Sequence, residues 1–154
     1  MTTNMDTLVV YFSKFGNTRL VAEAIAEVLR ADGVARVISL DELSPTDLEN
    51  IDLMVMGCPT HRMNLPEVIR PWFEKFPRRV LRGKASAAFD TSYKMSPWLR
   101  RFTAAPRLAR KLRKLGGKQV IAPETFHVVE RQGPLYEGEI ERVKSWANAI
   151  RVRL

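Results

Sequence analysis

The sequence predicts an α/β fold, a doubly wound parallel sheet with helices on both faces. Short apolar segments typical of strands alternate along the chain with segments whose apolar residues recur at helical spacing. The strand segments are nearly continuous apolar runs, which is typical of parallel strands that are buried on both faces. Because crossovers between parallel strands are right-handed, the connecting helices are expected to cover both sides of the sheet.

The first half of the chain contains three predicted strands. Residues 8–12 form a short β-prone run, and residues 20–29 then carry one apolar helical face before a glycine that is expected to stop the helix. A second strand is expected over residues 34–40 and a third around residues 53–56. The polar segment 44–50 between them reads as a short helix or a turn.

The second half continues the alternation. Residues 68–76 carry a second apolar helical stripe, and residues 85–89 form a fourth strand. Leucines at helical spacing predict a helix over residues 106–115, which a pair of glycines ends. A fifth strand is expected within residues 119–129, and a last apolar stripe predicts a helix over residues 140–150.

Length and composition indicate a soluble single domain over residues 1–154. The one cysteine, Cys58, excludes an internal disulfide and a cysteine-built metal site. His61 and His127 lie far apart without a ligand-like spacing, so no metal is expected. No apolar run approaches the ~20 residues of a membrane span, and no secretory signal is visible, which favours a cytoplasmic protein.

The segment 13–18, Ser-Lys-Phe-Gly-Asn-Thr, joins the first strand to the first helix and carries groups that suit a phosphate. It offers hydroxyl and amide groups, a glycine that permits close backbone approach, and the unpaired N–H groups of a helix start. The alternative is an ordinary turn with Ser13 and Asn17 as caps. The segment matches neither the ATP-binding nor the dinucleotide-binding glycine pattern, so ATP and NAD are poorly supported.

The stretch "YFSKFGNT" resembles the phosphate-binding loop of the flavodoxin family, whose usual pattern is T/S-x-T/S-G-x-T. Ser13, Gly16 and Thr18 match this pattern, and Phe15 replaces a common hydroxyl residue. The stretches "GCPTHRMNLPEVIRPWFEKF" and "KASAAFDTSYKM" are similar to the family's second loop with its following helix and to its fourth strand with its third loop. The resemblance implies a short-chain flavodoxin with a five-stranded sheet in the order 2-1-3-4-5 and bound FMN.

The same resemblance implies a role for each of the three loops. The residues expected to wrap the FMN phosphate are Ser13, Lys14, Phe15, Gly16, Asn17 and Thr18. The residues expected to flank one side of the flavin ring are Pro59, Thr60, His61, Arg62 and Met63, and those expected on the other side are Asp90, Thr91, Ser92, Tyr93 and Lys94. Tyr93 is the expected stacking aromatic, while the second loop has no Trp or Tyr and leaves one face of the ring less shielded.

The predicted function is therefore that of an FMN-binding redox protein that transfers electrons. Its partner is either a redox protein or a small-molecule electron acceptor. The alternative is an FMN-dependent oxidoreductase, such as a quinone reductase or a protoporphyrinogen oxidase-like enzyme. A third reading is a domain that has lost FMN and acts as a binding module.

The charge departs from the acidic composition usual in flavodoxins. The net charge is +8 and the pI is near 10.1. Residues 91–123 contain no Asp or Glu, and the basic region 94–118 is interpreted either as a solvated face or as a docking surface. An acidic protein or an anionic membrane is the expected partner of such a surface, and nucleic acid is the weakest choice. The segment 92–105 is interpreted as a lid over the flavin or, preferably, as a short helix packed on the domain.

Overall fold

A computed structural model of the chain describes residues 4–60 and 66–154. Its strands are β1 (Met5–Tyr11), β2 (Gly33–Ser39), β3 (Leu53–Pro59), β4 (Ala85–Tyr93), β5 (Lys118–Gln119) and β6 (Glu124–Val128). They form one parallel sheet in the order β2-β1-β3-β4-β5, with β6 also paired to β4. The predicted doubly wound sheet and its strand order are confirmed.

The fifth position in the sheet is occupied by two short strands instead of one. β5 pairs with the start of β4 through Ala85 and Lys118, and β6 pairs with its end from Phe89 and Glu124 onward. Between the two ladders lies Pro123, which has no N–H group to donate to a neighbouring strand. The edge strand is therefore interrupted, and β6 resumes pairing beside the carboxyl half of β4.

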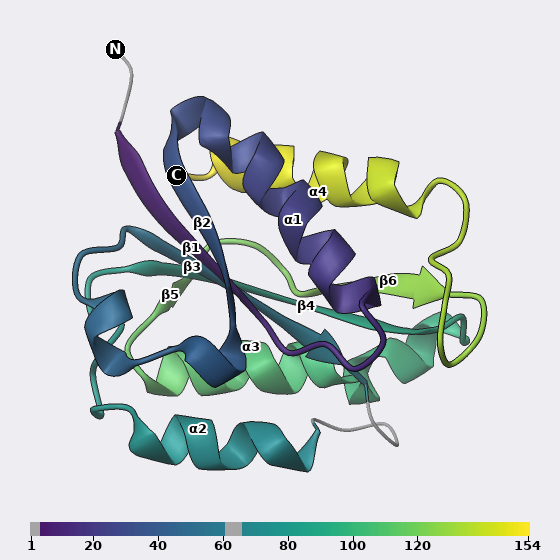
Figure 1. Ribbon diagram of the computed structural model, residues 1–154, viewed down its shortest axis with the longest axis horizontal. Helices are drawn as coiled ribbons and strands as arrows, with labels where there is room; N and C mark the ends of the chain where they lie inside the picture. Colours follow the sequence, from purple (N-terminus) through teal and green to yellow (C-terminus); the bar gives the residue numbers. More distant parts are fainter. Residues whose placement is uncertain (1–3, 61–65) are drawn as a thin grey trace.

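Two helices cover each face of the sheet. α1 (Asn17–Leu29) and α4 (Glu139–Val152) pack together on one face, and α2 (Arg70–Lys75) and α3 (Ala104–Lys114) lie on the other (Figure 1). Neighbouring residues of β1 illustrate the division, because Leu8 packs in the core under α3 while Val9 packs in the core under α1 and α4. The strands β1, β3 and β4 are buried on both faces, as their continuous apolar runs predicted.

Short 3-10 helices complete the fold. They are η1 (Arg30–Asp32), η2 (Leu40–Glu42), η3 (Pro45–Leu48), η4 (Glu67–Ile69) and η5 (Pro97–Phe102). The predicted helix over 68–76 is split into η4 and α2, since Pro71 near the start of α2 cannot donate a hydrogen bond to the preceding turn. Val68 was expected on the buried stripe of that helix, but it is 52% exposed.

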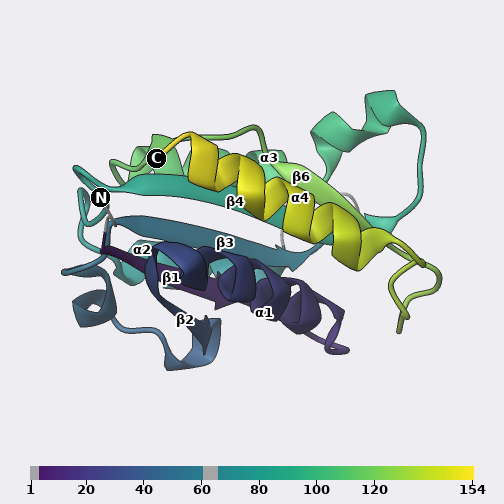
Figure 2. The same cartoon turned by 90° about the horizontal axis from the view of Figure 1, so that it is seen from above.

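The connection between β4 and α3 differs most from expectation. β4 extends to Tyr93, four residues beyond the predicted end, and α3 begins at Ala104. Between them η5 stands off from the body of the domain, beyond α3 and β6 (Figure 2). A short helix does form, but Trp98 is 62% exposed and Phe102 is 41% exposed, so the expectation that it packs on the domain is wrong for these two side chains. A short 3-10 turn has too few residues to form a broad face that could bury them.

Candidate functional site

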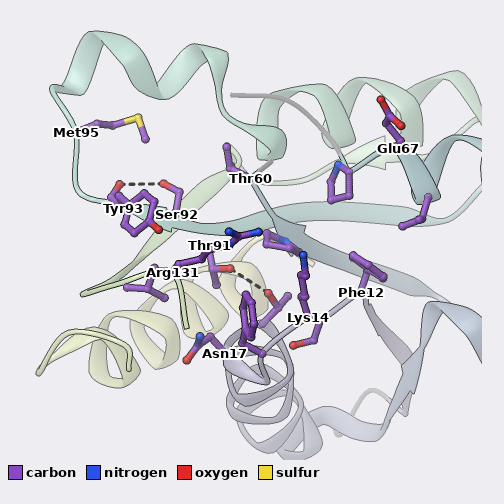
Figure 3. Close-up of a pocket in the computed structure, with 17 residues that line it drawn as sticks. Phe12, Lys14, Asn17, Thr60, Glu67, Thr91, Ser92, Tyr93, Met95 and Arg131 are labelled. Carbon is purple, nitrogen blue, oxygen red and sulfur yellow. Dashed lines mark hydrogen bonds between the residues drawn. The ribbon is translucent and has the colours of Figure 1, made fainter. Parts of the chain in front are cut away.

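A cavity of about 620 Å³ opens where the carboxyl ends of β1, β3, β4 and β6 meet (Figure 3). This is the edge at which parallel α/β sheets bind their ligands. Its lining residues are Phe12, Ser13, Lys14, Phe15, Asn17, Thr18, Pro59, Thr60, Pro66, Glu67, Val68, Thr91, Ser92, Tyr93, Met95, Val128 and Arg131. The three sequence segments expected at the site therefore do converge, and a fourth joins them.

The start of α1 forms one end of the site and is open to an anion. Gly16 precedes the helix with φ +92°, a left-handed conformation that favours glycine. Its N–H group donates to Ser13 Oγ at 2.9 Å, and its carbonyl accepts the N–H of Leu20 at 3.1 Å. No side chain among the described residues caps this helix, so the N–H groups of its first turn are available. A Cβ added at Gly16 would meet no atom within 4 Å, which leaves room above these donors.

Thr18 and Thr91 form the floor of the site. Both side chains are buried, and their hydroxyl oxygens lie 3.0 Å apart across the gap between α1 and β4 (Figure 3). This bond fixes the first loop against the fourth strand. Thr18 therefore lines the cavity with a hydroxyl that already has one protein partner.

A fourth wall, which the sequence analysis missed, follows β6. Arg131 lines the cavity, and the neighbouring Gly133 lies so close to Asn17 that an added Cβ would be 2.5 Å from Asn17 Oδ1. The chain after β6 thus packs against the first loop and adds a second cation, besides Lys14, to the lining of the cavity. The strand expected within residues 119–129 could have predicted this segment, because the carboxyl end of that strand reaches the same edge of the sheet.

Aromatic and apolar side chains also line the cavity. Tyr93, at the end of β4, is 50% exposed and lines this space together with Met95 and Val68. Pro59 and Thr60 contribute the wall from β3, where both were expected. The predicted site residues His61, Arg62 and Met63 lie outside the described residues.

Asp90 does not line the cavity, contrary to the expectation that it would lie beside the ligand. Side chains alternate along β4, so Thr91 points toward α1 while Asp90 points toward α3. The Asp90 Oδ2 atom accepts hydrogen bonds from the Ala105 N–H at 2.7 Å and from the Thr60 hydroxyl at 3.0 Å. Thr60 Oγ1 in turn accepts the Ala104 N–H at 3.0 Å. Asp90 therefore caps α3 and holds Thr60, a wall residue, in place.

The surroundings of Asp90 also affect its ionisation. Burial raises the pKa of this carboxyl above its ordinary value, although hydrogen bonds from Ala105, two threonines of the adjoining elements and Thr60 oppose the rise. Burial, with a smaller contribution from Asp90, likewise raises the pKa of the Cys58 thiol. Cys58 is thus a packed, protonated side chain and not a reactive thiolate.

Two further expected site residues have other positions. The Lys94 ammonium lies 4.1 Å from the centre of the Tyr136 ring and is not among the residues that line the cavity. Gly16 contributes backbone and open space, not a side-chain wall. In the described parts of the chain, no group of three His, Cys, Asp or Glu side chains forms a metal site, and no helix has the length and apolar character to cross a bilayer.

Comparison with known proteins gives a consistent picture. The family model described as Flavodoxin matches residues 9–146. Proteins named NAD(P)H dehydrogenase (quinone) from Acidovorax ebreus (strain TPSY) and Cupriavidus metallidurans are 30% identical over 110 residues, and 55% of this chain and 55% of each relative are covered. The chain thus spans about half the length of these curated relatives.

Solved structures share the fold at low sequence identity. Oxidised Flavodoxin 2 from Bacillus cereus is 21% identical, with a TM-score of 0.82 and coverage of 97% of this chain and 99% of that chain. Oxidised Flavodoxin 1 from the same organism is also 21% identical, with a TM-score of 0.78 and the same coverage. These similarities extend over nearly the whole chain and support the observed topology.

Proposed function

The chain belongs to the flavodoxin family, whose cofactor is FMN, and we propose that it works as a single flavodoxin-like domain over residues 1–154 that carries electrons for a partner. The observation that carries this proposal is the uncapped start of α1, which faces the cavity with open space above Gly16. A helix start of this kind favours a phosphate through its free N–H groups and its dipole.

The described residues fit FMN at both ends of the cavity. The group proposed to hold the phosphate consists of Ser13, Lys14, Phe15, Gly16, Asn17 and Thr18, with Arg131 added from the fourth wall. The group proposed to flank the ring consists of Pro59, Thr60, Thr91, Ser92 and Tyr93. The cavity volume of about 620 Å³ falls in the usual range for sites of small organic ligands.

FMN supplies the capacity to accept and release electrons, and this chain's residues determine where the cofactor sits and what reaches it. The half-exposed Tyr93 offers a ring face against which a flat heterocycle can stack. The apolar side chains of Val68 and Met95 add to the lining of the cavity. The Thr18–Thr91 bond keeps the two ends of the site at a constant separation.

The first test is direct. The purified protein is expected to be yellow, and acid extraction is expected to release FMN in a ratio near one per chain. The reduced protein should then pass electrons to an acceptor protein without consuming NAD(P)H in turnover. A colourless protein that retains no flavin absorbance after it is mixed with FMN and separated from free FMN would contradict the proposal.

A second candidate function is quinone reduction. The observation that favours it is the name of the two curated relatives, together with the apolar side chains of Val68 and Met95 in the lining of the cavity. An enzyme of this kind needs room for its substrate beside the flavin. Steady oxidation of NAD(P)H that depends on an added quinone would favour this function over that of a carrier.

Arg131 provides a test of the fourth wall. Arg131→Gln is expected to weaken FMN binding about two- to fivefold, because an exposed cation near a phosphate contributes modestly. Binding of riboflavin, which lacks the phosphate, should be unchanged. Arg36→Gln, an exposed change in β2 at the far edge of the sheet, is the matched control. Fluorescence titration with both flavins measures the effect, and equal losses for the two flavins would argue against a phosphate contact.

The proposal includes a partner and a location. The partner is a redox protein or a small-molecule electron acceptor, and the basic region 94–118 is proposed as the surface that meets an anionic partner. Its support is the outer side of α3, where Arg110, Arg113 and Lys114 are exposed. A cytoplasmic location is proposed as well, with the single unpaired Cys58 as its support.

A further inference from the structure

The connection between β4 and α3 presents aromatic side chains to solvent. We name Trp98, Arg101 and Phe102 the aromatic knuckle, since they belong to η5, which projects from the domain (Figure 2). Trp98 is 62% exposed and Phe102 is 41% exposed. Arg101 Nε donates to the Trp98 carbonyl at 3.3 Å, and its guanidinium lies 5.3 Å from the centre of the Phe102 ring. Two large apolar rings and a cation are thus held together on one protrusion.

A basic surface adjoins the knuckle. Along α3 the exposed cations are Arg110, Arg113 and Lys114, and the buried side chains are the leucines and alanines of the opposite side. The loop before β4 adds exposed cations at the far end of α3, where the Leu81 N–H donates to the Leu115 carbonyl at 2.9 Å. These cations are Arg78, Arg79 and Arg82. The one acidic residue of α2, Glu74, lines a groove together with Lys111 and Lys114.

We propose that the aromatic knuckle and the basic surface dock this protein on an anionic membrane surface. Trp and Phe side chains prefer the boundary between lipid headgroups and acyl chains, and Arg and Lys are attracted to anionic headgroups. The segment of residues 91–123 combines both kinds of side chain and contains no Asp or Glu. Its charge is therefore complementary to an anionic lipid surface along its whole length.

The shape of the knuckle favours lipid over an acidic protein. A stable protein partner needs a complementary surface of roughly 800 Å² on each side. The knuckle sits on a short 3-10 helix that projects from the domain, and both of its rings are exposed (Figure 2). Lipid headgroups can rearrange around a projection, so the rings can enter the interface without a preformed pocket.

Docking in this way would bring the cavity close to the bilayer. Tyr93 and Met95 line the cavity, and η5 begins only a short distance further along the chain, at Pro97. A membrane-dissolved electron acceptor would then meet the mouth of the site. This consequence for the choice of acceptor rests on the proposed function, whereas the docking itself does not.

The test is co-sedimentation of the purified protein with vesicles of phosphatidylcholine, alone or mixed with phosphatidylglycerol. The wild-type protein is expected to bind the mixed vesicles about tenfold more strongly than the neutral ones, and salt should weaken that binding. Trp98→Ser with Phe102→Ser should reduce binding several-fold, as should Arg110→Gln with Arg113→Gln and Lys114→Gln. The matched control is Leu20→Ser, which removes a side chain that is 52% exposed on α1.

The outcomes separate docking from redox function. Equal binding to both kinds of vesicle, or full binding by the knuckle variant, would overturn the proposal. Binding of soluble polyglutamate but not of mixed vesicles would also overturn it, in favour of an acidic protein partner. FMN content and electron transfer in solution are measured on the same samples. Vesicle binding by a protein that holds no FMN would leave docking supported and contradict only the proposed function.

Discussion

Riboflavin is expected to bind this protein at least about 100-fold more weakly than FMN. The two flavins differ by one phosphate, and the uncapped start of α1 offers that phosphate its free N–H groups. A hydrogen bond to a charged group contributes roughly 1.5–3 kcal/mol, so the loss of two or more such bonds accounts for a factor of this size. Fluorescence titration of the apoprotein with each flavin gives both dissociation constants.

The same site predicts a large effect of Gly16→Ala. Residues with a side chain lose about 1–2 kcal/mol in the left-handed conformation that Gly16 adopts at φ +92°. The new methyl group would also occupy the space that is free of protein atoms and is proposed for the phosphate. FMN affinity is expected to fall more than tenfold, with a smaller change for riboflavin.

The chain contains a matched control for this variant. Gly138 precedes α4 with φ 89° and ψ −10°, nearly the same backbone conformation as Gly16, and a Cβ added there also meets no atom within 4 Å. Gly138→Ala should therefore lower the free energy of unfolding about as much as Gly16→Ala, yet leave the affinity for FMN intact. Equal affinities of Gly16→Ala and Gly138→Ala for FMN would contradict a phosphate site at α1. Equal affinities of the wild-type protein for FMN and riboflavin would contradict it as well.

Asp90→Ala is expected to lower the free energy of unfolding by about 2–5 kcal/mol. Its carboxylate is the acceptor for the Ala105 N–H in a buried bond and for the Thr60 hydroxyl in a partly buried one. A buried donor without a partner costs about 1–3 kcal/mol, and two donors would be left. Because Thr60 lines the cavity, FMN affinity should fall as well. Urea denaturation of the apoprotein measures the change in the free energy of unfolding separately from the change in FMN affinity.

The ionisation of Asp90 predicts how this stability varies with pH. Because burial raises the pKa of Asp90 in the folded protein, the carboxyl stabilises the fold most below its unfolded pKa of about 3.9. This contribution is lost as the pH rises through the raised folded pKa. The side chain of the Asp90→Asn variant cannot ionise. The stability of this variant relative to the wild type should therefore increase as the pH rises from the unfolded pKa of Asp90 through its raised folded pKa. Parallel stability curves for the two proteins would show that the pKa of Asp90 is not raised by folding.

Much of the fold and the location of the site could be predicted because they depend on local patterns. Continuous apolar runs that alternate with helical stripes predict parallel strands covered on both faces, whichever residues make the contacts. The segment 13–18 stands between a strand and a helix, so its position at the carboxyl edge of the sheet follows from chain order alone. The conformation of Gly16 follows from the same turn.

The tertiary structure alone decided which side chains face the cavity. The predicted end of β4 was the last apolar residue, Phe89, but β4 continues to Tyr93 because distant groups satisfy its polar side chains. Asp90 faces the start of α3 and Thr91 faces α1, a division that depends on partners far away in the sequence. Arg131 reaches the site through the pairing of β6 with β4, and Trp98 is exposed on η5, which projects from the domain (Figure 2). Sequence periodicity specifies that a residue is apolar or polar, but long-range packing determines what it touches.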